Sequence, residues 1–174
     1  IPFITLLTTL FVVTGGIEIL GDIQARPRNN TLMLATGYIL ASLIGTTGAS
    51  MLLIHPLLRI NQQRTHKTHT ILFFIALVAN CGGILTPLGD PPLFLLYLRG
   101  AHFGWFMGMF RQWAAVGIAL LIIYYLTDRY FYYKKEGLAS IMADFREKTD
   151  ISFRGKFNII LLVGVVLSVL YINS

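Results

Sequence analysis

Hydrophobic residues occur along the chain in five long runs that are separated by short polar segments. The runs cover residues 1–20, 31–58, 70–98, 112–126 and 158–174. A run of about 20 apolar residues is long enough to cross a hydrocarbon core of roughly 30 Å as a helix. The pattern predicts an all-α polytopic membrane protein, with transmembrane helices at residues 1–20 and 104–127 and the start of another at residues 158–174.

The second run is too long and too interrupted for one membrane-spanning helix. As a single helix it would measure about 42 Å at 1.5 Å per residue. Its middle holds Gly45-Thr46-Thr47-Gly48-Ala49-Ser50, a poor helix interior, and Pro56 follows. Each half alone is too short to cross. We predict a re-entrant helical hairpin over residues 31–60, with its tip at residues 46–50.

The third run is broken by the segment Asn80-Cys81-Gly82-Gly83-Ile84-Leu85-Thr86-Pro87-Leu88-Gly89-Asp90-Pro91-Pro92. A regular helix cannot hold so many prolines and glycines. We predict one discontinuous helix over residues 70–98, with half-helices on either side of an unwound stretch at residues 84–91. Unwound backbone at membrane depth survives only where protein or a water-filled cavity satisfies its amides and carbonyls.

The composition indicates that lipid is the solvent of these runs. Hydrophobic residues make up 55% of the 174 residues, charged residues make up 13%, and the mean hydropathy is +0.68. A soluble domain usually has about 25% charged residues. The net charge of +6 is compatible with a nucleic-acid partner. However, the basic residues lie in short gaps between apolar runs, which is typical of membrane topology. We therefore expect a lipid bilayer as partner and no nucleic acid.

The positions of Lys and Arg predict an orientation. If the second run is a hairpin, the segments 21–30, 59–69 and 128–157 lie on one side and hold 2, 3 and 7 of the 14 Lys and Arg. Basic loops favour the cytoplasmic side. We predict a multi-pass inner-membrane protein with these segments in the cytoplasm. Residues 134–157 then form a connector, either an amphipathic surface helix or a solvated linker, between a membrane domain at residues 1–133 and the last run.

Asp90 is the strongest candidate for a functional residue. A carboxylate near the middle of a membrane costs about 2.5–3.5 kcal/mol on insertion scales, so its presence indicates function. The unwound backbone around it frees carbonyl oxygens, and Na⁺ prefers oxygen ligands. We predict Na⁺ ligands at Asp90, Asn80 and Thr86. Burial favours the protonated carboxyl and bound Na⁺ favours the ionised one, so one site can exchange the two ions. The alternative is that Asp90 only caps the second half-helix.

The predicted hairpin tip supplies further oxygens. Thr46, Thr47 and Ser50 carry hydroxyls, and Gly48 offers a hinge. A tip that meets the broken helix at mid-membrane would complete a cation shell. The alternative is that small residues here only allow close helix packing.

Glu18 and Asp22 lie four residues apart, which predicts one helical face that Thr14 extends. We consider Glu18 a candidate for a proton pathway. The alternative is that Glu18 and Asp22 pair with Arg26 or Arg28 at the membrane interface.

Two patterns typical of enzymes or metal proteins are weak. His66 and His69 have a spacing that resembles a zinc site, but nearby cations and a missing third ligand favour a basic cytoplasmic loop. Leu20-Gly21-Asp22 and Leu88-Gly89-Asp90 are similar to parts of an intramembrane aspartic protease, which needs two facing aspartates. The full Gly-x-Gly-Asp form is absent, and Asp22 is predicted near a membrane end. We expect no enzyme.

Three segments also carry a family resemblance. They are Thr14-Gly15-Gly16-Ile17-Glu18, Gly45-Thr46-Thr47-Gly48-Ala49-Ser50 and above all the Asn80 to Pro92 segment. Together they resemble the NhaD-type sodium/proton antiporters of the ion transporter superfamily, which also holds citrate and dicarboxylate carriers and the arsenite-efflux channel protein. The resemblance covers nearly the whole chain.

The resemblance implies an elevator-type carrier of Na⁺ and H⁺ without cofactors, built from two inverted repeats and often dimeric. The chain would be the first repeat and the start of the second, within a longer homodimeric transporter. By position, the resemblance assigns cation binding to Thr46, Thr47, Gly48, Ser50, Asn80, Thr86 and Asp90. The rival function is a Na⁺-coupled carboxylate carrier of the same architecture. Such carriers typically present Ser-Asn-Thr at hairpin tips, whereas this tip reads Gly-Thr-Thr-Gly.

Overall fold

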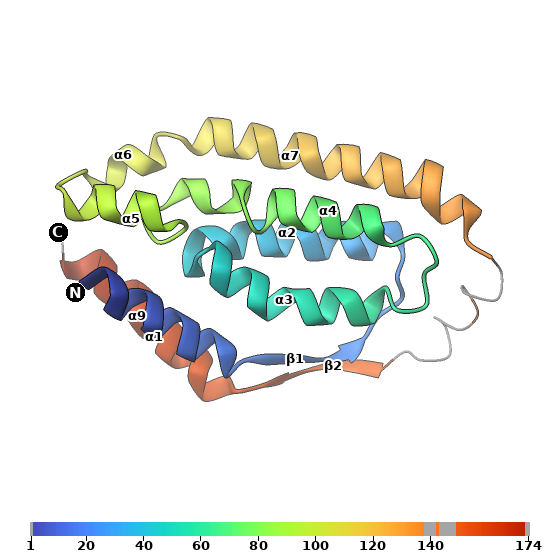
Figure 1. The fold of residues 1–174 in the computed structure, drawn as a ribbon, viewed down its shortest axis with the longest axis horizontal. Helices are drawn as coiled ribbons and strands as arrows, with labels where there is room; N and C mark the ends of the chain where they lie inside the picture. The colour runs from blue at the N-terminus through green and yellow to red at the C-terminus, as the bar shows by residue number, and fades with distance from the viewer. Residues whose placement is uncertain (1, 138–141, 143–148, 173–174) are drawn as a thin grey trace.

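The computed structural model describes residues 2–137, 142 and 149–172, and this part of the chain is mostly helical (Figure 1). The α-helices are α1 (Pro2–Gly15), α2 (Pro27–Ile44), α3 (Thr46–Ile60), α4 (Thr68–Leu77), α5 (Pro91–Leu98), α6 (Phe103–Met107), α7 (Phe110–Thr127) and α9 (Lys156–Ile172). Shorter elements are the 3₁₀-helices η1 (Cys81–Leu85) and η3 (Tyr133–Lys135), the π-helix η2 (Asp128–Tyr132), and the strands β1 (Glu18–Asp22) and β2 (Thr149–Arg154).

Among the described residues, two segments are long and apolar enough to cross a membrane. They are Thr68–Leu85, with a mean hydropathy of 1.8, and Phe110–Lys135, with 1.4. Apolar side chains of α7 are exposed along much of its length; Ile118 and Ile122, for example, are 58% and 53% exposed. Exposed apolar surface of this kind is stable in lipid and costly in water. These features fit the predicted class of helical membrane protein.

The helices α2 and α3 form a hairpin that turns at Gly45 (Figure 1). Gly45 has φ 84°, a conformation that only glycine adopts readily. The turn therefore lies just before the predicted tip, and residues 46–50 form the first turn of α3 instead of a loop. Buried side chains from both arms, such as Leu34 and Leu57, make the core of the chain together with Leu77 of α4.

The third apolar run is interrupted, and the interruption begins earlier than the sequence predicts. The helix α4 ends at Leu77, not near residue 82, and η1 follows. Gly82 lies so close to α2 that an added Cβ would be 2.8 Å from both the Ala41 Cβ and the Tyr38 carbonyl oxygen. Backbone after η1 is extended at Thr86 and again at Asp90, and α5 begins at Pro91. We call residues 78–90 the break.

The first apolar run departs from the prediction. The helix α1 ends at Gly15, and β1 pairs with β2 in an antiparallel ladder that aligns Glu18 with Arg154. The predicted helix over residues 1–20 is therefore wrong at its end, and Thr14, Glu18 and Asp22 do not share a helical face. Two consecutive glycines, Gly15 and Gly16, disfavour continued helix.

The strand β2 falls inside the predicted connector at residues 134–157, where the sequence analysis expected a helix or a linker. The prediction of an all-α chain is therefore wrong at this one strand pair. Residues 138–141 and 143–148 of the predicted connector lie outside the described residues. Figure 1 shows α9, which follows β2, running beside α1.

Candidate functional site

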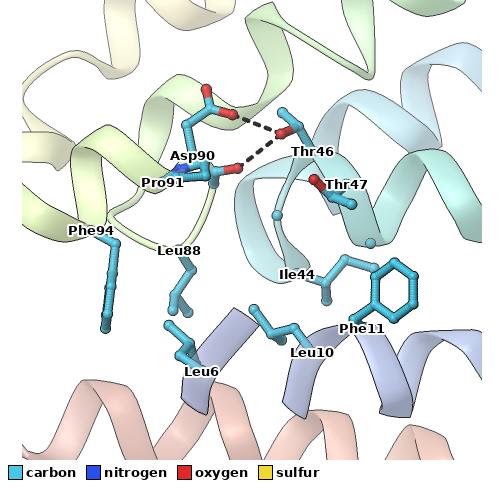
Figure 2. A pocket seen from close by; sticks show the side chains of 13 residues that line it. Leu6, Leu10, Phe11, Ile44, Thr46, Thr47, Leu88, Asp90, Pro91 and Phe94 are labelled. Atoms are coloured by element: carbon cyan, nitrogen blue, oxygen red, sulfur yellow. Dashed lines mark hydrogen bonds between the residues drawn. The ribbon is translucent and has the colours of Figure 1, made fainter. Parts of the chain in front are cut away.

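A cavity of about 220 Å³ lies where the hairpin turn meets the break (Figure 2). The helix α1, the hairpin turn, the break and the start of α5 line it. The helix α1 contributes an apolar wall, the turn contributes small and hydroxyl residues, and the break contributes the only carboxylate of this lining. The lining residues are Leu6, Leu10, Phe11, Ile44, Gly45, Thr46, Thr47, Gly48, Leu88, Gly89, Asp90, Pro91 and Phe94.

Backbone and side-chain hydrogen bonds join the turn directly to the break. The backbone N–H of Thr46 donates to the Gly89 carbonyl over 2.8 Å. The Thr46 hydroxyl lies 2.7 Å from Asp90 Oδ1 and 3.3 Å from the same Gly89 carbonyl. The contacts of the Thr46 hydroxyl are the dashed lines of Figure 2. The two interruptions of the chain thus form one unit.

The close packing of the hairpin turn against the break requires glycine at positions 45 and 89. An added Cβ at Gly45 would lie 3.1 Å from the Leu88 carbonyl oxygen, and one at Gly89 would lie 1.7 Å from the Gly83 carbonyl oxygen. The second distance is far below any real contact, and the obstructing atom belongs to the backbone. The glycine-rich composition of both segments therefore has a packing reason in addition to its effect on helix propensity.

Asp90 precedes α5 but does not cap the helix through its side chain. Its backbone carbonyl accepts the N–H groups of Leu93 and Phe94 at 3.0 and 3.2 Å. The carboxylate instead points toward Thr46, away from α1 (Figure 2), and its other oxygen lies against Gly83. The alternative reading of Asp90 as a helix cap thus does not account for its carboxylate.

The other predicted residues of the turn take different positions. Thr47 is exposed to the cavity, and Figure 2 shows its hydroxyl directed toward the break. Gly48 lines the cavity but is buried against Thr14, whose Cγ2 would be 3.1 Å from an added Cβ. Ser50 does not line the cavity, and its buried hydroxyl has no hydrogen-bond partner within the described residues.

Thr86 and Asn80 are not brought to the cavity. The buried Thr86 hydroxyl donates to the Ser42 carbonyl of α2. Asn80 is exposed, and its amide donates to the Ile75 carbonyl over 2.8 Å. The last carbonyls of a helix lack intrahelical donors, and these two side chains donate to such carbonyls in the last turns of α2 and α4. The predicted ligand set of Asp90, Asn80 and Thr86 is therefore not assembled in this structure.

The sequence analysis missed side chains that hold the break in place. Ser42 of α2 and Trp113 of α7 both donate to the Gly82 carbonyl, at 2.5 and 3.1 Å. Tyr38 stacks on Trp113 with ring centroids 4.7 Å apart and donates to the Trp113 carbonyl. A serine inside an apolar helix was the available signal for Ser42, because buried hydroxyls need partners. Nothing local signals Trp113.

Glu18 and Asp22 lie in β1, and only their backbone positions are described. Asp22 comes five residues before the start of α2, whereas Asp90 meets the other end of that helix. The 18 residues of α2 measure about 27 Å. The structure therefore does not bring together the two aspartates that a protease would need.

Comparisons with known proteins assign the chain to a family. A family model described as "Putative citrate transport" matches residues 1–174. The chain belongs to this citrate-transport family. The uncharacterized transporter MJ0672 of Methanocaldococcus jannaschii is 33% identical over 107 residues, which is 60% of this chain and 24% of that protein. The alignment thus spans about a quarter of the relative's length. No solved structure matches the chain.

Family membership is in line with the coarse prediction of a membrane transporter. In this member of the citrate-transport family, the described lining of the cavity holds one carboxylate and no Lys, Arg or His. The nearest hydroxyl already donates to that carboxylate. A cation is therefore favoured beside Asp90, and an anion that contacts Asp90 directly is disfavoured by like charge.

Proposed function

We propose that this chain supplies a cation site to a secondary active transporter that exchanges Na⁺ for H⁺. The observation that carries the proposal is the hydrogen bond between Thr46 and Asp90, which joins the hairpin turn to the break at the wall of the cavity. Discontinuous segments that meet in this way are where secondary transporters place their coupling-ion sites.

The chemistry follows from the oxygens that the junction offers. Asp90 contributes a carboxylate, and Thr46 and Thr47 contribute hydroxyls. Hard cations prefer such oxygen ligands. A proton and Na⁺ compete for the carboxylate, because protonation removes the charge that attracts the metal ion. Alternate occupancy by H⁺ and Na⁺ exchanges the two ions without a cofactor.

The set of cation ligands that we propose is smaller than the set predicted from the sequence. We propose that Asp90, Thr46 and Thr47 are ligands. Asn80 and Thr86 fix the path of the break through the carbonyls to which they donate. Gly48 and Ser50 belong to the packing of α3, and remaining ligands come from other parts of the full-length transporter.

The proposed arrangement in the membrane keeps the sequence-based topology. The hairpin of α2 and α3 is re-entrant, and the turn reaches mid-membrane. The basic segments 21–30, 59–69 and 128–157 face the cytoplasm, the protein sits in the inner membrane, and the full-length transporter is a homodimer of two-repeat chains. Segment 59–69 and residues 23–30 and 128–137 lie at the hairpin end opposite the cavity, whereas β2 runs from that end back toward the end of α1 (Figure 1).

A Na⁺-coupled citrate carrier is the second candidate function. The family description favours it. Thr47 and Gly48 at the N-terminus of α3 also line the cavity, where the helix dipole favours negative charge. In this version a bound cation neutralises Asp90, and a carboxylate of the substrate lies on the α3 side.

Flux through the reconstituted full-length transporter separates the two functions. Proteoliposomes with an internal pH dye receive a Na⁺ pulse, either with or without citrate. Antiport predicts Na⁺-driven proton movement in the absence of any organic anion. A strict requirement for citrate would replace antiport with the carrier function, and proton movement that is independent of Na⁺ would contradict both.

A further inference from the structure

The span Phe110–Lys135 lies along one edge of the fold, and its exposed side carries an apolar stripe (Figure 1). Ile118, Ile122 and Leu126 of α7 are all exposed. Because they are four residues apart, they lie on one face of the helix. The same spacing places the exposed Tyr130 of η2 next along this face. From Ile118 to Tyr130 the helix rises about 18 Å, slightly more than half of a hydrocarbon core of roughly 30 Å.

The stripe ends in a group of cations. Arg129, Lys134 and Lys135 of η2 and η3 are all exposed. Two of them lie against the same aromatic ring: the Arg129 guanidinium carbon is 5.8 Å, and Lys134 Nζ is 5.1 Å, from the centroid of Tyr130. Arg129 also donates to the Tyr125 hydroxyl over 2.7 Å. Aromatic rings attract cations, and here they hold two like charges close to each other.

The carboxylates of the same segment are buried. Asp128 is 0% exposed and accepts a hydrogen bond over 3.0 Å from Arg64, which is 5% exposed and lies at the base of the hairpin, opposite its turn. The Glu136 side chain is 2% exposed and accepts two backbone N–H groups of the loop after α3. Within the described residues, none of the three exposed cations takes part in an ion pair. The described surface at the end of α7 is therefore positive.

An apolar stripe that ends in cations is complementary to an amphiphile with a negative head group. The acyl chains of a phospholipid cover half of the hydrocarbon core, which is about the length of the stripe. The phosphate lies at the membrane surface, where tyrosine is favoured and where each Lys or Arg is attracted to anionic lipid. A second copy of the chain in the same membrane orientation is less suitable. A twofold axis along the stripe would bring the same cations together.

We propose that this face of α7 binds one anionic phospholipid, with an acyl chain along the stripe and the phosphate between Arg129 and Lys134. The inference rests on the proposed placement in the membrane, in which α7 spans the bilayer and residues 128–137 face the cytoplasm. It does not depend on which ion the cavity binds. Asp128 precedes Arg129 and is bonded to Arg64. A lipid bound here therefore stabilises the contact between α7 and the base of the hairpin.

The first measurement is lipid retention by the purified full-length transporter. Delipidated protein in detergent receives phosphatidylglycerol or phosphatidylcholine with identical acyl chains, and native mass spectrometry reports the bound fraction of each. We expect a preference for phosphatidylglycerol that weakens as the salt concentration rises. Equimolar inorganic phosphate should not displace the lipid, because it gains nothing from the apolar stripe. Equal retention of the two lipids, or displacement by phosphate, would overturn the proposal.

Substitutions of exposed residues assign the preference to this face. Arg129→Gln and Lys134→Gln should each reduce the affinity for phosphatidylglycerol about fivefold and leave that for phosphatidylcholine unchanged. Arg111→Gln is the matched control, because Arg111 is an exposed cation at the other end of the same helix. A wild-type preference in the double variant of Arg129 and Lys134 would place the lipid elsewhere. An equal loss in Arg111→Gln would indicate a general effect of charge. Either result would overturn the proposal.

Photo-crosslinking locates the acyl chain without any substitution, so it decides the proposal even if the variants fail to fold. Phosphatidylglycerol with a diazirine in one acyl chain is irradiated with the wild-type transporter in nanodiscs, and mass spectrometry identifies the labelled peptides. We expect label on residues 118–126, and less label from a matched phosphatidylcholine probe. Equal labelling by the two probes, or no label on this stretch, would contradict the proposal. Na⁺/H⁺ flux is measured separately, so such a failure leaves the proposed function standing.

Discussion

The Thr46 hydroxyl donates to the Asp90 carboxylate at 2.7 Å, across 44 residues of sequence. This bond joins the turn of a helical hairpin to the break of the following helix. It places a carboxylate beside two hydroxyls, at the wall of a cavity whose far side is the apolar face of α1. The proposed cation site depends on this junction.

Removing the Thr46 hydroxyl should weaken cation binding. A hydrogen bond to a charged group contributes about 1.5 kcal/mol, which corresponds to roughly a tenfold change in affinity. Thr46→Val should therefore raise the Na⁺ concentration for half-maximal transport about tenfold. Thr46→Ser keeps the hydroxyl and serves as the control. Equal half-saturation values for the two variants would show that the hydroxyl has no role.

Adding a methyl group at Gly89 should destroy the junction. The Cβ would lie 1.7 Å from a backbone oxygen of Gly83, which cannot move without moving the break. We expect Gly89→Ala to lower the yield of monodisperse protein in size-exclusion chromatography and to abolish transport. Gly104→Ala is the matched control, because no atom lies within 4 Å of its added Cβ. Wild-type yield and transport for Gly89→Ala would refute the close packing.

Ser42 and Trp113 should act together on the Gly82 carbonyl. Ser42→Ala or Trp113→Phe removes one of the two donors described above, and each should cost about 1 kcal/mol of stability. The double variant leaves the buried carbonyl without either donor. Its cost should therefore exceed the sum of the single costs by at least about 0.5 kcal/mol, as measured by thermal unfolding in detergent. Strict additivity would mean that the two donors do not share this acceptor.

Arg64 should be a major contributor to stability at the hairpin base. Removing one partner of a buried ion pair leaves the other charge uncompensated, at a cost of about 3–5 kcal/mol. Arg64→Gln should lower the melting temperature strongly. Arg59→Gln changes an exposed side chain nearby and should shift stability by less than about 0.5 kcal/mol. Similar melting temperatures for the two variants would contradict the buried pairing with Asp128.

The positions of both chain interruptions could be read from the sequence, because glycine and proline act locally on the backbone. Gly45 and Pro91 mark the turn and the start of α5 through their own conformational limits. Asp90 stood out because a carboxylate is rare in an apolar run. These features are local, so they can be predicted without knowing the tertiary contacts of the residues.

The partners of the side chains could not be read in the same way. Thr86 and Asn80 were predicted as ligands from their nearness to Asp90 in sequence, yet each donates to a backbone carbonyl in the last turn of a helix, Thr86 in α2 and Asn80 in α4. The pairing of β1 with β2 joins residues that are far apart in the chain, and so does the contact between Arg64 and Asp128. Such long-range contacts are set by tertiary packing, which leaves no periodic signal in one sequence.

The most direct test of the cation site compares the protons that the wild type and the Asp90→Asn variant release when Na⁺ binds. Purified full-length protein in weakly buffered detergent solution receives Na⁺, and a pH dye reports the protons that the carboxyl gives up. We predict release from the wild type, none from Asp90→Asn and undiminished release from Asn80→Ala, whose side chain does not reach the cavity. Undiminished proton release from Asp90→Asn would contradict the assignment of the site to Asp90.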